Sequence, residues 1–253
     1  MRTVCISASP KKRWSNSAYL LAAAKRFIRG EKESIHFRGA KDYPRIFDAL
    51  LKADALVLAM PVYVDAVPSH VLELLQKIEQ FAKEHDLHFR VYALCNCGFY
   101  EGEQCELEME MLQCWCERAG LTFCGGTGVG AGEMIGFLPL VPIIGLAAML
   151  LEFLIRLSFL IGGGMVTPAA VLGCLHPMVF LISAAVGILF SMGPWAAAAK
   201  LGKNVSAAHD CGIHYTTVSF CPAFLFVFFA SIYWALRAFF MHFVPVWRLF
   251  RRQ

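Results

Sequence analysis

Charged side chains are scarce in this chain, and their absence is concentrated in one stretch. They make up 17% of the 253 residues, against 58% hydrophobic residues, whereas soluble domains usually carry about 25% charged residues. No Asp, Glu, Lys or Arg occurs between Leu157 and Ala199. Residues 1–136 carry 16 basic and 17 acidic side chains, and the remainder carries 7 and 2. The first part therefore has the composition of a soluble domain, and most of the rest does not.

A secretory signal peptide and a metal-binding motif are also missing. Met1-Arg2 leads into an apolar run too short for the hydrophobic region of a signal peptide, so we expect the soluble part to stay in the cytoplasm. The ten Cys are scattered, and the pairs Cys95/Cys97 and Cys114/Cys116 are C-x-C rather than C-x-x-C. We therefore expect reduced, mostly buried thiols and no metal ion. A metal or iron–sulfur site is the alternative.

Residues 1–136 alternate between strand and helix patterns. Apolar runs typical of buried strands lie at 4–7, 34–37, 55–60, 89–94 and 121–126. Helical patterns lie at 15–29, 44–52, 68–83 and 101–118. This alternation predicts an α/β fold with a doubly wound, five-stranded parallel sheet. Ligands of such sheets bind beyond the carboxyl ends of the strands, so the loops there are the candidate site.

The loop after the first strand is rich in hydroxyl groups and basic side chains, and it leads directly into a helix. Helix N-termini favour anions because their backbone N–H groups are free and the helix dipole is positive there. A phosphate group is therefore the expected ligand. The candidate side chains are Ser9, Lys11, Ser15, Asn16 and Ser17.

The loops after the third and fourth strands add aromatic side chains. Residues 60–69 contain Tyr63, and residues 96–104 contain Phe99 and Tyr100 together with a flexible Gly98. Aromatic and backbone groups at these positions could hold the two edges of a flat ring. With the phosphate loop, they indicate a phosphorylated cofactor that carries a planar ring system.

These three loops, in this order, resemble those of the flavodoxin-like NAD(P)H-dependent FMN reductase family. One branch of that family has a Pro-x-Tyr-x-Asp-x-x-Pro-Ser segment, as here from Pro61, and an Asn-x-Gly-Phe-x-Glu segment, as here from Asn96. The resemblance covers residues 1–136 well and 193–208 loosely. It implies FMN as the cofactor, NAD(P)H as the electron donor, and phosphate contacts from the hydroxyl and amide residues of the first loop. It further implies that the ring is flanked by Pro61, Val62, Tyr63 and Val64 on one side and by Asn96, Gly98, Phe99 and Tyr100 on the other.

Two features depart from the family pattern. Many members carry Gly after the first strand and Arg in the phosphate loop, whereas this chain has Ser7 and the run Lys11-Lys12-Arg13. Which basic residue contacts the phosphate is therefore open. The glycine run 125–132 follows the last strand rather than the first, so we interpret it as a close-approach loop at the sheet edge and not as a dinucleotide fingerprint.

The remaining chain predicts membrane-type helices. Two apolar runs, 137–161 and 169–192, are each about as long as the roughly 20 residues that span a bilayer. They predict a transmembrane hairpin over residues 137–192, with two buried core helices as the alternative. Residues 193–210 regain soluble character and should complete the α/β domain, so the hairpin would be an insertion. Residues 211–253 predict an apolar, basic helix that is either interfacial or transmembrane.

Together these patterns predict a membrane-attached FMN-dependent oxidoreductase with its α/β domain on the cytoplasmic side of the cell membrane. Hydride from NAD(P)H would pass through the flavin to a small-molecule or protein acceptor, with a lipid-soluble quinone as one candidate. The flavin carries the chemistry, so no catalytic side chain is expected. Membrane lipid is an expected partner, the resemblance implies a homodimer, and the slightly acidic domain argues against nucleic acid. The alternatives are a non-enzymatic electron carrier that docks a membrane redox partner, and a flavin-free domain that serves assembly.

Overall fold

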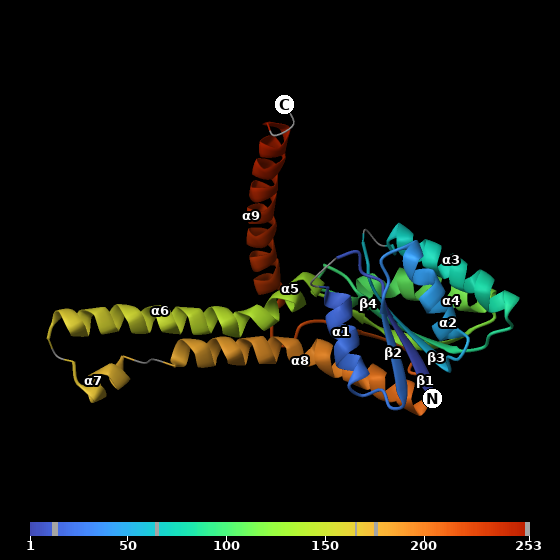
Figure 1. Cartoon of the computed structure of the whole chain (residues 1–253), viewed down its shortest axis with the longest axis horizontal. Coiled ribbons are helices and arrows are strands. Elements are labelled where there is room, and N and C mark those ends of the chain that lie inside the picture. The colour runs from blue at the N-terminus through green and yellow to red at the C-terminus, as the bar shows by residue number, and fades with distance from the viewer. Residues whose placement is uncertain (12–14, 64–65, 165, 175–176, 251–253) are drawn as a thin grey trace. The chain divides into compact units, whose positions relative to one another are not determined.

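The computed structural model describes residues 1–11, 15–63, 66–164, 166–174 and 177–250 (Figure 1). The chain divides into two compact units, Met1–Ser219 and Phe220–Gln253. The first unit holds the sheet, the helices that cover it and a pair of long apolar helices. The second unit holds a single long helix. Each unit is described here by itself.

The sheet of the first unit is parallel throughout and has the strand order β2-β1-β3-β4-β5-β6. Its first five strands follow the flavodoxin-like order, in which a ligand crevice opens where the strand order reverses beside β1. The doubly wound parallel sheet predicted from the sequence is therefore confirmed. The strands are β1 (Arg2–Ser7), β2 (Glu31–His36), β3 (Ala55–Pro61), β4 (Arg90–Asn96), β5 (Thr122–Val129) and β6 (Ile213–Thr216).

Helices cover both faces of the sheet. Figure 1 shows α2, α3 and α4 on one face, and α1 with the C-terminal half of α8 on the other. The main core lies between the sheet and α2–α4, and the opposite face includes a small alanine cluster of Ala23, Ala24 and Ala198. The helices of the first unit are α1 (Asn16–Lys25), α2 (Tyr43–Leu50), α3 (Ser69–Glu84), α4 (Glu106–Ala119), α5 (Gly132–Phe137), α6 (Val141–Gly162), α7 (Pro168–Gly173) and α8 (Met178–Ala207). Short 3₁₀ turns are η1 (Ala40–Asp42), η2 (Gly102–Cys105) and η3 (Leu138–Leu140).

The prediction of five strands is wrong by one, because β6 adds a sixth. Only four residues long, β6 pairs in parallel with β5 from Gly126↔Ile213 to Val129↔Thr216. A strand this short carries little periodic signal. Its place depends on contacts made far away in the chain, since a side chain at Gly125 would collide with the backbone of Gly212.

The glycine run also differs from its interpretation as a loop at the sheet edge. Most of it lies inside β5, which is flanked by β4 on one side and β6 on the other. The close approach is real: a Cβ at Gly126 would lie 2.7 Å from the Ala93 carbonyl oxygen, and one at Gly128 would lie 2.7 Å from the Tyr215 ring. The glycines thus let neighbouring strands and turns pack tightly against β5.

Residues 178–207 form one continuous helix, α8, where the sequence predicts a hairpin helix followed by a separate helix from residue 193. Pro194 lies inside α8. Proline lacks an N–H, so the carbonyl four residues earlier loses its helical partner. That carbonyl, on Phe190, instead accepts a hydrogen bond from the Ser219 N–H at 3.0 Å. The helix therefore passes through the Gly193-Pro194 pair without leaving a carbonyl unpaired.

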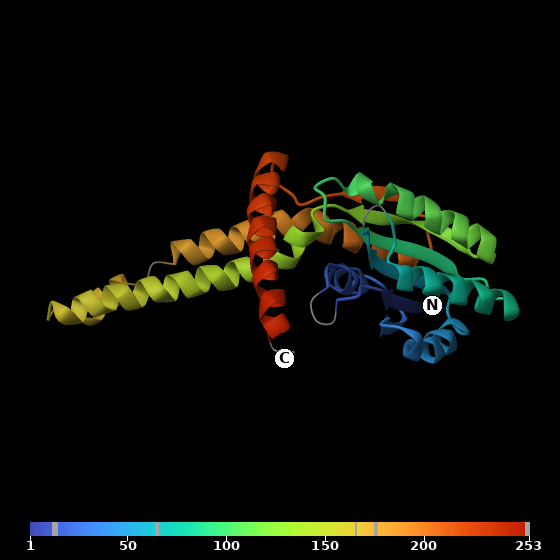
Figure 2. The same ribbon diagram turned by 90° about the horizontal axis from the view of Figure 1, so that it is seen from above.

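The N-terminal half of α8 packs against α6 to form a helical hairpin (Figures 1 and 2). The contact is close because a side chain at Gly145 of α6 would collide with Ser183 of α8. Both helices are long and apolar enough to cross a membrane by length and composition, and only 6% and 11% of their apolar windows are buried. The alternative of two buried core helices is therefore wrong. In the second unit, α9 (Ala223–Phe250) is likewise apolar.

Candidate functional site

The carboxyl ends of β1, β3 and β4 bring the three predicted loops to one edge of the sheet. Pro61 is in register with Asn96, so β3 and β4 end at the same level, and β1 ends slightly earlier, with Ser7 opposite Ala59. The chain leaving β1 stays attached to β3, because the Ala8 N–H donates to the Ala59 carbonyl at 2.8 Å. The parallel register, which buried apolar strands favour, thus positions the loops.

The first loop ends in a capped helix. Ser15 is the N-cap of α1, in extended conformation, and its hydroxyl accepts a hydrogen bond from the Ala18 N–H at 3.3 Å. The Ser9 hydroxyl accepts one from the Lys11 N–H at 3.4 Å. Ser7, at the end of β1, is buried, and its hydroxyl has no hydrogen-bond partner among the described residues. Hydroxyl groups and a helix N-terminus therefore converge here, in a form suited to a phosphate.

Two of the predicted phosphate residues are already used inside the protein. The Asn16 side chain donates to the Gly132 carbonyl, and the buried Ser17 hydroxyl donates to the Asn96 Oδ1 atom at 2.7 Å. These bonds fasten the start of α1 to the ends of β4 and β5. Asn16 and Ser17 thus connect α1 to the ends of β4 and β5, whereas the hydroxyls of Ser9 and Ser15 accept bonds from their own loop and helix.

The second loop is held by backbone bonds and presents an aromatic ring. The Val62 N–H donates to the Asn96 carbonyl at 2.9 Å, which joins this loop to the third one. Tyr63 pairs with Ala66 through two backbone bonds, and its side chain is 42% exposed. Pro61 is buried at the end of β3, and Val64 lies outside the described residues.

The third loop combines a buried base with an exposed tip. Asn96 is buried, Gly98 is exposed, Tyr100 is half-buried, and Phe99 is 59% exposed. The loop is fastened to the segment after β5: the Cys97 carbonyl accepts from the Gly132 N–H at 2.8 Å, and the Phe99 carbonyl accepts from the Ala131 N–H. Tyr63 and Phe99 thus follow paired strand ends, and both side chains are exposed.

Two parts of the site were not predicted from the sequence. Gly130 and Gly132 lie directly under the third loop, where a Cβ at Gly132 would lie 2.6 Å from the Cys97 carbonyl oxygen. The His70 ring, from the start of α3, lies 3.0 Å from the Ala8 carbonyl oxygen and stacks on Phe37. The glycine run indicated a close approach but not which residues approach it. Nothing in the sequence indicated a role for His70.

A buried group of thiols and one carboxyl lies beneath the third loop. Cys95 of β4 and Cys97, directly after it, lie near Cys105 of η2 and Glu108 of α4. Burial raises the pKa of Glu108 to about 8, and the residue is 2% exposed. Within the part of the chain that the structure describes, no group of His, Cys, Asp or Glu has the arrangement of a metal site. Nothing in the acidic run 101–117 singled out Glu108.

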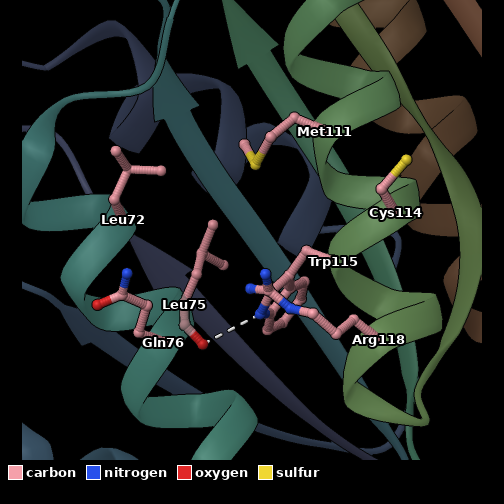
Figure 3. Close-up of a pocket in the computed structure, with 7 residues that line it drawn as sticks. All are labelled: Leu72, Leu75, Gln76, Met111, Cys114, Trp115 and Arg118. Carbon is pink, nitrogen blue, oxygen red and sulfur yellow. Dashed lines mark hydrogen bonds between the residues drawn. The ribbon is translucent and has the colours of Figure 1, made fainter.

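Two cavities lie away from the strand ends. A groove of about 410 Å³ runs between α3 and α4, and Figure 3 shows the Trp115 ring at its base, with the indole N–H donating to the Leu75 carbonyl at 3.0 Å. A cavity of about 240 Å³ lies between α8 and the β5–β6 edge, where Lys200 Nζ and His214 Nε2 are 3.2 Å apart. Neither is formed by the three loops.

Comparison with known proteins finds likeness in structure only. No protein-family model matches the chain, and no curated protein matches its sequence. Three of the similar solved structures are the Trp repressor binding protein from Bacillus subtilis, an NADH:FMN oxidoreductase in its apo form, and the NAD(P)H:quinone oxidoreductase from Methanothermobacter marburgensis. Their sequence identities to this chain are 15%, 20% and 12%, with TM-scores of 0.42, 0.40 and 0.44. The matches cover 49%, 48% and 81% of this chain and 85%, 71% and 96% of the respective other chain. At such identities the likeness concerns the fold alone.

Proposed function

We propose that this chain is a flavin-dependent oxidoreductase that binds FMN at the carboxyl ends of β1, β3 and β4. One observation carries the proposal: the three loops with flavin-binding character meet at one edge of the sheet and are joined there. Asn96 is the junction, because its side chain accepts from Ser17 and its carbonyl accepts from Val62. A site assembled from separate segments in this way is held in one geometry before any ligand arrives.

Each part of FMN has a matching set of residues. The phosphate would lie at the N-terminus of α1, among Ser9, Lys11 and Ser15, where Lys11 adds positive charge. The buried Ser7 hydroxyl, which lacks a partner among the described residues, offers one more hydrogen bond there. The ring would lie between the exposed aromatic side chains of Tyr63 and Phe99. When bound, FMN would supply the redox chemistry, with NAD(P)H as the hydride donor.

The remaining residues have positioning roles. Ser17 holds the Asn96 amide, so that the amide can face the ring edge in a fixed orientation. Asn16 and the Gly130–Gly132 segment hold the third loop from the far side of β4. Exposed Phe99 would cover the ring and exclude water from it. Proton transfer by a side chain is not required for hydride uptake.

We further propose that the α6/α8 hairpin attaches the flavin domain to the cytoplasmic face of the cell membrane. Three observations support this: the length of both helices, their exposed apolar side chains, and the absence of charged residues from 157 to 199. The electron acceptor would then be a lipid-soluble molecule such as a quinone, or a membrane redox protein. A carrier that only docks such a protein would not oxidise NAD(P)H by itself.

The first test is an absorbance spectrum of the full chain purified in detergent, recorded before and after anaerobic addition of NADPH. Flavin bands that bleach with NADPH are the expected result. Bands that persist until dithionite is added would instead indicate an electron carrier. A protein that stays colourless after incubation with FMN would overturn the proposal in both forms.

Two variants make the test specific to the site. Lys11→Glu reverses the charge beside the expected phosphate, and Phe99→Ala removes one wall of the ring site. Each should weaken FMN binding, by about tenfold, or 1.4 kcal/mol, for the charge reversal. Lys41→Glu, in η1, is the matched charge control. Equal FMN affinities for Lys11→Glu and Lys41→Glu would place the phosphate elsewhere.

A further inference from the structure

Cys97 and Cys105 belong to one buried cluster beneath the third loop. Cys97 follows β4 and Cys105 ends η2, so the two thiols close a short loop that contains Gly98, Phe99 and Tyr100. The two thiols lie close enough to share a hydrogen bond. Cys97 Sγ in turn lies 3.3 Å from the Glu101 carbonyl oxygen. Both cysteines are free thiols and both are buried.

The backbone holds the two cysteines in place from the same stretch of β5. The Cys97 N–H donates to the Val129 carbonyl at 3.0 Å. A Cβ at the neighbouring Gly128 would lie 2.9 Å from the Cys105 Cβ atom. Gly102 fixes the turn before Cys105, because a Cβ there would lie 2.5 Å from the Thr216 carbonyl oxygen. The positions of the two cysteines are therefore set by one backbone hydrogen bond and two close approaches that require glycine.

The two thiols differ chemically in a way that suits disulfide exchange. The hydrogen bond from Cys105 lowers the pKa of Cys97, whereas the same bond together with burial raises the pKa of Cys105. In thiol–disulfide exchange the thiolate attacks first, and a second thiol then resolves the mixed disulfide. Cys97 has the character of the attacking thiol and Cys105 that of the resolving thiol.

We propose that Cys97 and Cys105 are a redox-active dithiol that forms a reversible disulfide by exchange with a low-molecular-weight disulfide. Cys97 attacks one sulfur of the small disulfide, which forms a mixed disulfide and releases one small thiol. Cys105 then loses its proton and attacks Cys97, which forms the Cys97–Cys105 bond and releases the second small thiol. Two protein thiols are oxidised, and one small disulfide is reduced to two thiols.

The disulfide would change the shape of the third loop. A sulfur–sulfur bond is about 2.05 Å long, which is shorter than any hydrogen-bonded sulfur pair, so Cys97 and the turn at η2 must move together. Phe99 and Tyr100 lie between them on the loop. Insofar as the proposed FMN site is correct, we expect the oxidised form to bind FMN more weakly, by at least about threefold.

Exchange requires the loop to open, because Cys97 is 2% exposed and Cys105 is fully buried. The tip of the loop is suited to this motion. Gly98 has no neighbour within 4 Å of an added Cβ, and the Phe99 side chain is largely exposed. A bound ring that contacts Phe99 would hold the loop closed, so FMN should slow the oxidation.

The test is a redox titration of the full chain in detergent, without added flavin, in glutathione buffers of increasing oxidised fraction. After quenching with an alkylating agent, cleavage beside Glu101 and Glu103 separates the two cysteines, so a disulfide appears as one linked peptide pair. We expect a single transition in the wild type, which is lost in both Cys97→Ser and Cys105→Ser and kept in the exposed-thiol control Cys114→Ser.

Outcomes for the dithiol and for the flavin site are separate. A linked Cys97–Cys105 peptide in a protein that binds no FMN would support the dithiol and overturn the flavin site. Thiols that are both alkylated at every glutathione ratio, in wild-type protein whose fold is verified by circular dichroism, would overturn the dithiol whatever the flavin spectrum shows. Because this readout uses the wild type, it does not depend on whether the serine variants fold.

Discussion

Asn96 accepts hydrogen bonds from two other loops, which makes its partner Ser17 a sensitive position. Removing the Ser17 hydroxyl leaves the buried Asn96 Oδ1 atom without its 2.7 Å donor. A buried hydrogen bond of this kind contributes about 1 kcal/mol, and an acceptor left unsatisfied costs about 1–3 kcal/mol. Ser17→Ala should therefore lower the unfolding temperature and weaken FMN binding, measured by thermal circular dichroism and by flavin fluorescence titration.

The control for Ser17 is Ser158, whose exposed hydroxyl donates to a carbonyl within its own helix at 2.7 Å. Ser158→Ala leaves only a carbonyl that already has a helical partner. It should therefore change neither the unfolding temperature nor the affinity for FMN. If Ser17→Ala and Ser158→Ala behave alike, the Ser17–Asn96 bond does not organise the site.

Glu108 should make the stability of the fold depend on pH. Its pKa is about 8 in the folded state because of burial, against 4.5 for the ordinary side chain. The folded state therefore keeps the proton that the unfolded state releases, so the contribution to stability is full below pH 4.5 and is lost as pH rises toward 8. Glu108→Gln removes the titrating group and with it this loss of stability at high pH. At about 1.4 kcal/mol per pKa unit, the substitution should stabilise the protein at pH 8 by a few kcal/mol at most.

Unfolding temperatures at pH 5.5 and pH 8 measure this effect. The wild type should lose stability between the two values, and the slope should be shallower in Glu108→Gln. Glu110→Gln, on the exposed face of the same helix, is the matched control and should keep the wild-type slope. An unchanged slope in Glu108→Gln would mean that the buried carboxyl is not the group that titrates.

Between secondary-structure elements, the contact of α6 with α8 in the hairpin depends on Gly145. A side chain there would collide with Ser183, and overpacking of this kind costs about 1–3 kcal/mol. Gly145→Leu should separate the two helices. Arg156 is the one Lys or Arg between Arg118 and Lys200, so trypsin cleavage there reports on the hairpin. We expect faster cleavage at Arg156 in Gly145→Leu. Electrophoresis of the two fragments measures the rate.

Gly162 provides the control, because an added Cβ at this position of α6 meets no atom within 4 Å. Gly162→Leu adds the same side chain to the same helix without the collision and should leave cleavage at the wild-type rate. Equal cleavage rates for the two leucine variants would mean that the Gly145 contact does not hold the hairpin together.

The elements that the sequence predicts well are those with a strong local pattern. β3 is apolar throughout and buried on both faces, so its expected span of 55–60 is nearly the observed Ala55–Pro61. β6 and the continuity of α8 depend on contacts that no local pattern records. β6 needs the Gly125–Gly212 approach, and α8 needs Ser219 to bond with the Phe190 carbonyl that Pro194 leaves unpaired.

The same distinction holds for the candidate site. The order of the three loops predicted that they meet, because parallel strands end at one edge. The sequence could not show that Asn16 and Ser17 bond to Gly132 and Asn96, since a polar side chain can serve a ligand or the protein equally well. The Cys97–Cys105 contact was missed for a similar reason. A spacing of eight residues across a loop and a 3₁₀ turn has no characteristic pattern.

At the scale of the whole molecule, the hairpin should place the protein in the membrane. Leu154 of α6 and Ile188 of α8 are exposed apolar side chains near the middle of their apolar segments. A lysine at the centre of a spanning helix costs about 2.5–3.5 kcal/mol. The wild type should float with lipid vesicles and resist an alkaline wash, and the double variant Leu154→Lys/Ile188→Lys should be largely released.

Leu107→Lys serves as the control, because Leu107 is equally exposed but lies on α4 of the α/β domain. That variant should float with the vesicles as the wild type does. A double variant that still floats would show that the hairpin is not the anchor. A wild type that stays in the soluble fraction would contradict membrane attachment as a whole.

Because α8 is continuous, it connects the hairpin directly to the α/β domain. Its N-terminal half belongs to the hairpin, and its C-terminal half packs on α1, where Gly202 lies directly against the Ala24 carbonyl. Without a break between these halves, a tilt of the hairpin at Gly187 is also a displacement at Gly202. Because α1 packs on α8 and Ser15 caps the N-terminus of α1, such a displacement would pass through α1 to the proposed phosphate loop. In a bilayer, the thickness and tension of the lipid would thereby act as a force on the proposed cofactor site.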